Sequence, residues 1–164
     1  YTDTEFDISK LLNSGYNLLE LGRSCIHPDY RDGKVIQLLW KGIGIYIAFH
    51  NINYLFGCAS FMGVDAEKHR NAISFLMRYH KAPDEISPVA RDEISANIDI
   101  IEKEKVDKKA AFGELPTLLK GYIRAGCMVG DGAIIDDYCK TTDVCMIMDT
   151  SRIAKRYSEH FVKE

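Results

Sequence analysis

The feature that most limits the fold is a strand–helix–strand pattern between residues 18 and 61. Leu18 to Cys25 (LLELGRSC) alternates imperfectly between apolar and polar residues, as a strand does. Residues 35–49 are apolar on nearly every side, which predicts a buried helix. Residues 54–61 (YLFGCASF) are short and rich in aromatic residues, which predicts a buried strand. Such a unit forms a right-handed crossover, so we expect residues 17–27 and 54–61 to be adjacent parallel strands.

The rest of the chain predicts a mixed sheet with helices on both faces. The clearest later strand is residues 141–148, and residues 127–135 predict another with a Gly-Asp-Gly kink. These strands are expected to pair antiparallel. The sequence therefore predicts an α/β (α+β) fold with one domain over residues 1–164. Four further helices are expected: one capped by Asp65 and extending to Tyr79, a surface helix over 89–106, one over 116–126, and one from about Ser151, capped by Thr150 or Ser151.

Composition excludes several classes of protein. The chain has 164 residues and a formal net charge of −3, which disfavours a strongly basic nucleic-acid binder. No stretch approaches the roughly 20 apolar residues that cross a bilayer. The five cysteines show no Cys-x-x-Cys pair, so we expect reduced thiols, buried in the apolar runs, and a cytoplasmic protein. The chain starts at Tyr1 rather than at Met, and we expect its true N-terminus to be missing.

The turn from His27 to Val35 precedes a helix and is a candidate anion site. Unpaired N–H groups and the helix dipole favour an anion there, and Gly33 lets a phosphate approach the backbone. Arg31 and Lys34 add positive charge. An ordinary strand–turn–helix corner with solvated charges is the alternative.

Glu20 and Arg23 lie just upstream, at the end of the first strand. Three residues apart, they would lie on opposite faces of a regular strand, and a bulge at Gly22 would turn both toward one cleft. Alternatively, Glu20 faces solvent and Arg23 is structural. Their place at the carboxyl end of a strand favours a functional role.

The acidic residues and histidines of the sequence match no known metal-binding or catalytic motif. Asp131, Asp136, Asp137 and Asp143 are acidic residues of a kind that can bind a divalent metal, but they lack any known ligand spacing. We expect solvated acids and no metal. The histidines form no His-Glu-x-x-His motif, and no Gly-x-Ser-x-Gly elbow supports a serine hydrolase.

The run from Leu19 to Trp40 (LELGRSCIHPDYRDGKVIQLLW) resembles the core of bacterial N-acyltransferases that make lyso-ornithine lipid. These proteins are often labelled hemolysin-like and belong to the GNAT-type superfamily, with acyl-homoserine-lactone synthases as relatives. The resemblance covers nearly the whole chain. It continues at residues 54–61, 115–126, 141–144 and 156–161.

The resemblance implies a GNAT-like fold in which residues 17–27 form the central strand. Residues 34–49 would be the helix that binds the phosphopantetheine arm of an acyl donor. The family has an N-terminal strand–helix–strand–strand portion that this chain lacks, since Tyr1 to Leu12 resembles the segment just before the central strand. We therefore expect the C-terminal portion of the family's domain, with exposed apolar side chains where the sheet is uncovered.

General GNAT proteins hold the pyrophosphate of coenzyme A with an Arg-x-x-Gly-x-Gly/Ala loop. Here Arg31 is followed by a single glycine, Gly33, and then by bulky Val35 and Ile36. This departure favours a donor with one phosphodiester, as on acyl carrier protein, with coenzyme A as the alternative. No tightly bound cofactor is implied.

The implied reaction moves a 3-hydroxy fatty acyl group from acyl carrier protein to the α-amine of ornithine. Glu20 would be the general base, directly or through one water, while Arg23 would hold Glu20 or bind the substrate carboxylate. Ser24 is a weaker polar candidate. Backbone N–H groups near Cys25 and Ile26 would polarise the thioester carbonyl.

The donor phosphate is expected at Arg31, Gly33, Lys34 and Val35. Asp143 is a substrate-binding candidate and the alternative base. Three apolar residues are expected either to line an acyl tunnel or to belong to the core: Leu39, Phe56 and Phe61.

Acyl carrier protein and ornithine are the expected partners, with a peripheral inner-membrane contact and no nucleic acid. Two other functions remain open. One is coenzyme-A-dependent acylation of another small amine, and the other is a non-catalytic acyl-binding module.

Overall fold

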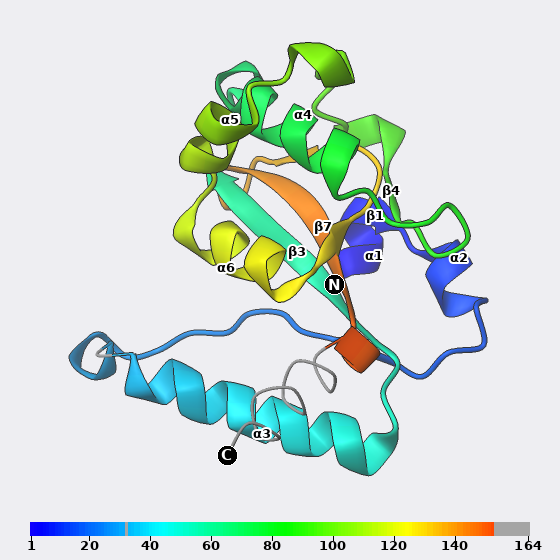
Figure 1. The fold of residues 1–164 in the computed structure, drawn as a ribbon, viewed down its shortest axis with the longest axis vertical. Coiled ribbons are helices and arrows are strands. Elements are labelled where there is room, and N and C mark those ends of the chain that lie inside the picture. Colours follow the sequence, from blue (N-terminus) through cyan, green and yellow to red (C-terminus); the bar gives the residue numbers. More distant parts are fainter. Residues whose placement is uncertain (32, 153–164) are drawn as a thin grey trace.

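The computed structural model describes residues 1–31 and 33–152 of the chain, and its sheet contains the expected parallel pair. Strand β2 (Leu18–Glu20) pairs in parallel with β3 (Tyr54–Met62), with Leu18 opposite Tyr54 and Glu20 opposite Phe56. Helix α3 (Lys34–His50) connects the two strands (Figure 1). The predicted strand–helix–strand unit is confirmed.

The first strand is shorter than predicted. The Leu21 amide donates to the Phe56 carbonyl at 2.8 Å, and the chain then leaves β3 without further pairing to it. Residues 22–25 are exposed, and Arg23 has a positive φ of 53°. An extension of the strand to residue 27 is therefore wrong, because these small and polar side chains bury no apolar surface that would hold them against the sheet.

The remaining strands complete a mixed sheet around β7 (Thr141–Asp149). This strand pairs antiparallel with β3 along its whole length, from Thr141 opposite Met62 to Asp149 opposite Tyr54. On its other edge β7 pairs with β5 (Met128–Val129) and β6 (Ile134–Asp136). The strand predicted over 127–135 is thus two short strands, separated by the Gly-Asp-Gly turn.

Helices cover both faces of this sheet, as predicted (Figure 1). On one face lie α4 (Arg70–Tyr79), α5 (Lys108–Glu114) and α6 (Thr117–Ala125). We call this the α4/α6 face; it packs alternate side chains of β3 and β7, including Leu55, Phe61, Val144 and Met146. The other, the α1 face, is covered by α1 (Thr2–Glu5), α2 (Ser9–Leu12) and the pair of β1 (Phe6–Asp7) with β4 (Val89–Ala90). It packs Phe56, Cys145 and Ile147.

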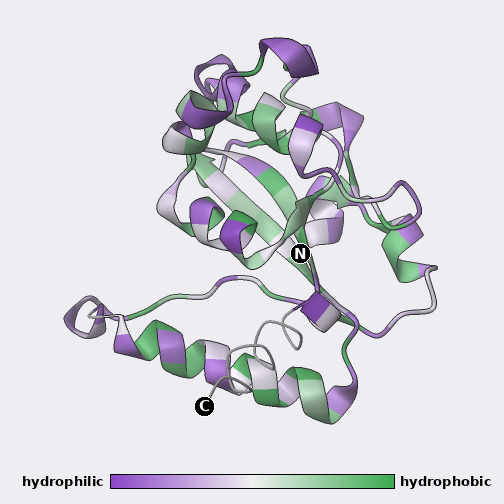
Figure 2. Cartoon of the chain, viewed as in Figure 1, coloured by the Kyte–Doolittle hydropathy of each residue, from purple (hydrophilic) through white to green (hydrophobic). Residues whose placement is uncertain are grey.

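Helix α3 is less buried than predicted. It lies beside the α4/α6 face, apart from the sheet (Figure 1), and none of its residues, all of which are described, is buried. Trp40, Ile43 and Ile47 reach the core only in part. Several large apolar side chains of α3 are exposed: Ile36, Leu38, Leu39, Ile45, Tyr46 and Phe49. Figure 2 shows several hydrophobic segments, in green, along this helix. Helix α3 therefore contributes only part of its apolar surface to the core.

The surface helix predicted over residues 89–106 is wrong. The structure has β4, two single 3-10 turns (Asp92–Ile94 and Lys103–Lys105) and irregular backbone between them. In a helix, the backbone N–H and C=O groups of this segment would bond to one another. Here some of them form hydrogen bonds with side chains of α4 instead. Arg70 donates to the Asp99 carbonyl at 2.7 Å, Arg78 donates to the Ile101 carbonyl at 2.9 Å, and the Ser74 hydroxyl accepts from the Ile101 amide at 3.0 Å. Tertiary hydrogen bonds thus replace the helical ones.

The helix ends agree with the sequence in part. Helix α6 follows Pro116 and ends at Gly126, with a φ of 91°, as predicted. Helix α4 buries Ala72, Ile73 and Leu76 as predicted, but Asp65 does not cap it and instead pairs with Lys68 at 3.3 Å. A helical turn starts at Thr150, where the Asp149 carboxylate accepts from the Ser151 amide. The rest of that predicted helix lies outside the described residues.

Two further observations concern the whole chain. The five cysteines all lie in the described ranges and are free, with Cys127 and Cys145 buried. Burial raises the pKa of both buried thiols, which keeps them protonated. Within the described ranges, no helix has the length and apolar character needed to cross a bilayer.

Candidate active site

The two parallel strands separate immediately after Glu20, and a small apolar groove lies at this point. A Cβ atom on Gly57 would overlap the carbonyl oxygen of Leu21, so only glycine lets the departing chain pass this close to β3. The groove has a volume of about 40 Å³. Trp40 of α3 and Tyr122 of α6 form part of its wall, with their rings edge to face and their centroids 6.4 Å apart.

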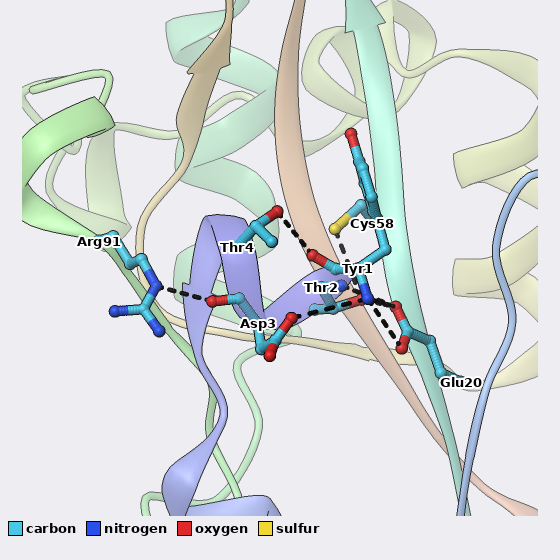
Figure 3. Close-up of polar contacts among 7 residues, drawn as sticks. All are labelled: Tyr1, Thr2, Asp3, Thr4, Glu20, Cys58 and Arg91. Atoms are coloured by element: carbon cyan, nitrogen blue, oxygen red, sulfur yellow. Dashed lines mark hydrogen bonds and ion pairs between the residues drawn. The ribbon is translucent and has the colours of Figure 1, made fainter.

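Glu20 lies at the same point but on the α1 face of the sheet (Figure 3). Its Oε1 accepts from both the amide and the hydroxyl of Thr2, each at 2.7 Å. The Cys58 thiol donates in turn to the Thr2 hydroxyl at 3.7 Å. Desolvation by itself raises the pKa of Glu20, but the hydrogen bonds from Thr2 are among the contacts that outweigh it and lower the pKa. Glu20 is therefore a carboxylate at neutral pH.

Glu20 does not lie on the side of the sheet that faces α3. Side chains alternate along β2, so Leu19 and Leu21 pack on the α4/α6 face beside α3, whereas Leu18 and Glu20 lie on the α1 face. The groove and the carboxylate are still adjacent. Phe56, which pairs with Glu20, and Cys58, which contacts Thr2, both line the groove.

The structure does not bring Arg23 to Glu20. Arg23 and Ser24 are exposed in the irregular segment after β2, and no bond between Arg23 and Glu20 occurs in the described part of the chain. Cys25 is exposed and Ile26 is half-buried in the same segment. Arg23 is a non-glycine residue with a positive φ, so its backbone is strained, and such strain is frequent in functional segments.

The candidate phosphate residues do lie together, at the start of α3. Gly33 is the residue before the helix, with a φ of 87° and no side chain to cap it, and Lys34 and Val35 form the first turn. The Arg31 side chain donates to the Ile26 carbonyl at 2.9 Å, which closes the preceding turn. The start of a 17-residue helix with two flanking cations is chemically suited to a phosphate.

Asp143 lies on β7 opposite Ser60 and is buried on the α1 face. One of its oxygens lies within 4.8 Å of carboxylate oxygens of Glu5 and Asp136. Burial raises the pKa of Asp143; the nearby hydroxyls of Thr141 and Ser60 oppose this, and the charges of Glu5 and Asp136 add to it. Of the four aspartates considered from sequence, only Asp136 and Asp143 therefore come together. Asp131 binds Lys81 at 2.8 Å, and Asp137 lies 3.4 Å from Lys140.

Sequence reasoning missed Glu5. Its helix is only four residues long and is held in place by distant groups, since Arg91 donates from Nε to the Asp3 carbonyl and from its amide to the Glu5 carbonyl. No local pattern signals that contact. The one available signal is an acidic residue beside the apolar Phe6 near a strand.

The three candidates for an acyl tunnel do not share one channel. Phe61 is buried on the α4/α6 face and Phe56 on the α1 face, while Leu39 is 40% exposed on α3. Of the three, only Phe56 lines the groove.

Comparison with known proteins shows similarity to acyltransferases. Residues 1–41 match the family model described as an acetyltransferase (GNAT) domain. The chain is 40% identical over 163 residues to the L-ornithine N(alpha)-acyltransferase of Rhodobacter capsulatus, covering 99% of this chain and 62% of that protein. It is 41% identical to the protein of the same name from Rhizobium meliloti, covering 98% of this chain and 55% of that protein.

A third relative, from Brucella abortus, has the same name and is 40% identical, with 59% of its length covered. The chain thus spans little more than half the length of the curated relatives it matches. No solved structure matches the chain significantly. The mixed sheet with its parallel β2–β3 pair agrees with a GNAT-like fold. The chain is thus similar over nearly its whole length to relatives named L-ornithine N(alpha)-acyltransferase, and its first 41 residues match a GNAT domain.

Proposed function

We propose that this chain belongs to an enzyme that transfers a 3-hydroxy fatty acyl group from acyl carrier protein to the α-amine of ornithine. The names of its relatives support the acceptor. The observation that carries the proposal is the separation of β2 from β3, with an apolar groove against one face of the sheet and the Glu20 carboxylate on the other. A thioester delivered through this separation meets an amine held at Glu20.

The donor side is proposed to run from the start of α3 to the groove. Arg31, Gly33, Lys34 and Val35 hold the phosphodiester of the phosphopantetheine arm, using the helix N-terminus. The single glycine of this turn supports acyl carrier protein over coenzyme A as donor. Backbone N–H groups at Cys25 and Ile26 are proposed to donate to the thioester carbonyl as its oxygen gains negative charge.

The acceptor side is proposed to use Glu20 as the base. The α-ammonium of ornithine gives one proton to Glu20, directly or through one water, and the neutral nitrogen attacks the thioester carbon. A C–N bond forms and the C–S bond breaks. The leaving thiolate takes the second proton from the attacking nitrogen, so the products are an amide and the free thiol of the arm, and Glu20 releases the first proton to solvent. Exposed Arg23 is proposed to bind the ornithine carboxylate, with Ser24 as a further polar contact.

The proposal is tested by supplying the protein with labelled ornithine and either 3-hydroxyacyl-acyl-carrier-protein or the matching coenzyme A ester. We expect N-acylornithine, identified by mass spectrometry, from the carrier-protein donor. Product from coenzyme A alone would favour the coenzyme-A-dependent alternative. Donor binding without transfer to any amine would favour an acyl-binding module.

Replacing Arg31 with alanine should raise the KM for the acyl donor about 10-fold, because a charge-assisted phosphate contact is lost. The value of kcat should stay close to that of the wild type. Lys41→Ala is the matched control, since Lys41 is exposed two turns further along α3. Steady-state kinetics with varied donor measures both variants. Equal KM values for Arg31→Ala and the wild type would exclude this phosphate site.

A further inference from the structure

Three carboxylates converge beneath α1 from three different elements: Glu5 of α1, Asp136 of β6 and Asp143 of β7. Glu5 and Asp143 are only 5% and 4% exposed. Among the described residues, Glu5 Oε2 and Asp143 Oδ1 have no hydrogen-bond partner.

Such an arrangement is unfavourable without a positive group. Buried carboxylates this close repel one another, and an unpartnered buried oxygen also loses its hydration. The raised pKa of Asp143 reflects this burial and the neighbouring charges. A cation with hydrogen atoms to donate would supply both the missing charge and the missing hydrogen bonds.

The number of available oxygens fits an alkylammonium group better than a divalent metal. Asp136 Oδ1 already accepts from the amides of Tyr138 and Cys139 at 2.8 Å each, and Oδ2 accepts from the Tyr1 hydroxyl at 3.4 Å. Among the described residues, Glu5 Oε2 and Asp143 Oδ1 are unpartnered, and Asp136 Oδ2 has a second lone pair. These three acceptors match the three N–H donors of an ammonium group. Calcium takes six to eight oxygen ligands, and magnesium requires near-ideal octahedral geometry.

The cluster also lies on the same side of the sheet as Glu20. Thr2, which binds Glu20, and Glu5 are three residues apart on α1, so their Cβ atoms are about 5–6 Å apart on one face of the helix. Cys58 of β3 contacts Thr2 between the strand positions opposite Glu20 and Asp143. A molecule with two amines separated by four carbons would present one amine to Glu20 and the other to the cluster.

We propose that Glu5, Asp136 and Asp143 bind the side-chain ammonium of the diamino acid acceptor and so select ornithine over amino acids without a second amine. This inference rests on the proposed function, because it requires ornithine at Glu20. The cluster positions and selects the acceptor, while Glu20 takes part in proton transfer.

The test compares ornithine with 2-aminopentanoate, which has the same carbon chain but lacks the side-chain amine. Asp143→Asn should raise the KM for ornithine about 10- to 100-fold, as expected for the loss of a hydrogen bond to a charged group. The KM for 2-aminopentanoate should change by less than about 3-fold, within the small effect of an uncharged hydrogen bond. Asp137→Asn is the matched control, because Asp137 is exposed in the adjoining turn. Glu5→Gln, expected to behave as Asp143→Asn does, replaces that variant if it fails to fold.

Three results would overturn the inference. Equal KM increases for both amino acids would indicate a structural role. Loss of turnover with EDTA, restored by Mg²⁺ or Ca²⁺, would indicate a metal site. The third is absence of ornithine binding, measured by calorimetry on the donor-free protein. Ornithine binding that Asp143→Asn weakens would support the cluster even if no acyl transfer occurred, in which case only the proposed function would fail.

Discussion

Replacing Glu20 with glutamine should lower kcat about 100- to 10,000-fold at pH 7, the usual contribution of a general base. The amide keeps an oxygen that accepts from Thr2, so the position of α1 should be preserved, and the KM for the donor should change little. Steady-state kinetics at saturating donor measures the effect. Glu104→Gln, an exposed substitution far along the chain, is the control.

The loss caused by Glu20→Gln should shrink as the pH rises. Because the pKa of Glu20 is lowered, its carboxylate is already ionised well below pH 7, and it does not set the profile near neutrality. The acceptor amine has a free carboxylate beside it, so it titrates above the roughly pH 8 of a chain N-terminus, and above its own pKa it needs no base. A pH–rate profile of both proteins checks this. Wild-type turnover by Glu20→Gln at pH 7 would exclude Glu20 as the base and direct attention to Asp143.

Replacing Gly57 with alanine should lower the free energy of unfolding by about 1–3 kcal/mol, the usual cost of forcing an extra methyl group into a packed site. The new Cβ would overlap the Leu21 carbonyl oxygen, which is backbone and cannot rotate away. To accommodate it, the chain after Glu20 must move off β3, and this changes the groove. We therefore expect a loss of turnover along with the loss of stability.

Urea unfolding of Gly57→Ala, with Gly113→Ala as control, measures the stability change. Gly113 lies inside α5, where an added Cβ atom would meet nothing within 4 Å, so alanine there should stabilise the protein by about 0.5–1 kcal/mol. If Gly57→Ala unfolds at the wild-type urea concentration and retains wild-type turnover, the close approach of Leu21 is unimportant for both folding and activity.

Local patterns predicted those elements whose structure depends on their own side chains. The apolar run of 54–61 and the strand from Thr141 were both predicted, as was the helix between Pro116 and Gly126. The crossover rule then predicted the parallel pairing. The prediction of a helix over residues 89–106 was wrong because the backbone there forms hydrogen bonds with arginine and serine side chains of α4. The local spacing of apolar residues does not reveal such contacts.

Some residues of the candidate site could likewise be placed from local sequence, whereas others could not. Arg31, Gly33 and Lys34 could be placed from local patterns at the start of a helix after the first strand, because near neighbours in the chain stay near in space. That Glu20 binds Thr2 on the α1 face, and that Glu5 lies near Asp143 although the two are far apart in the sequence, follows from the fold alone. The side of a strand on which a carboxylate lies depends on where the strand stops pairing and on which segment covers each face, and both are set by packing between segments distant in the sequence.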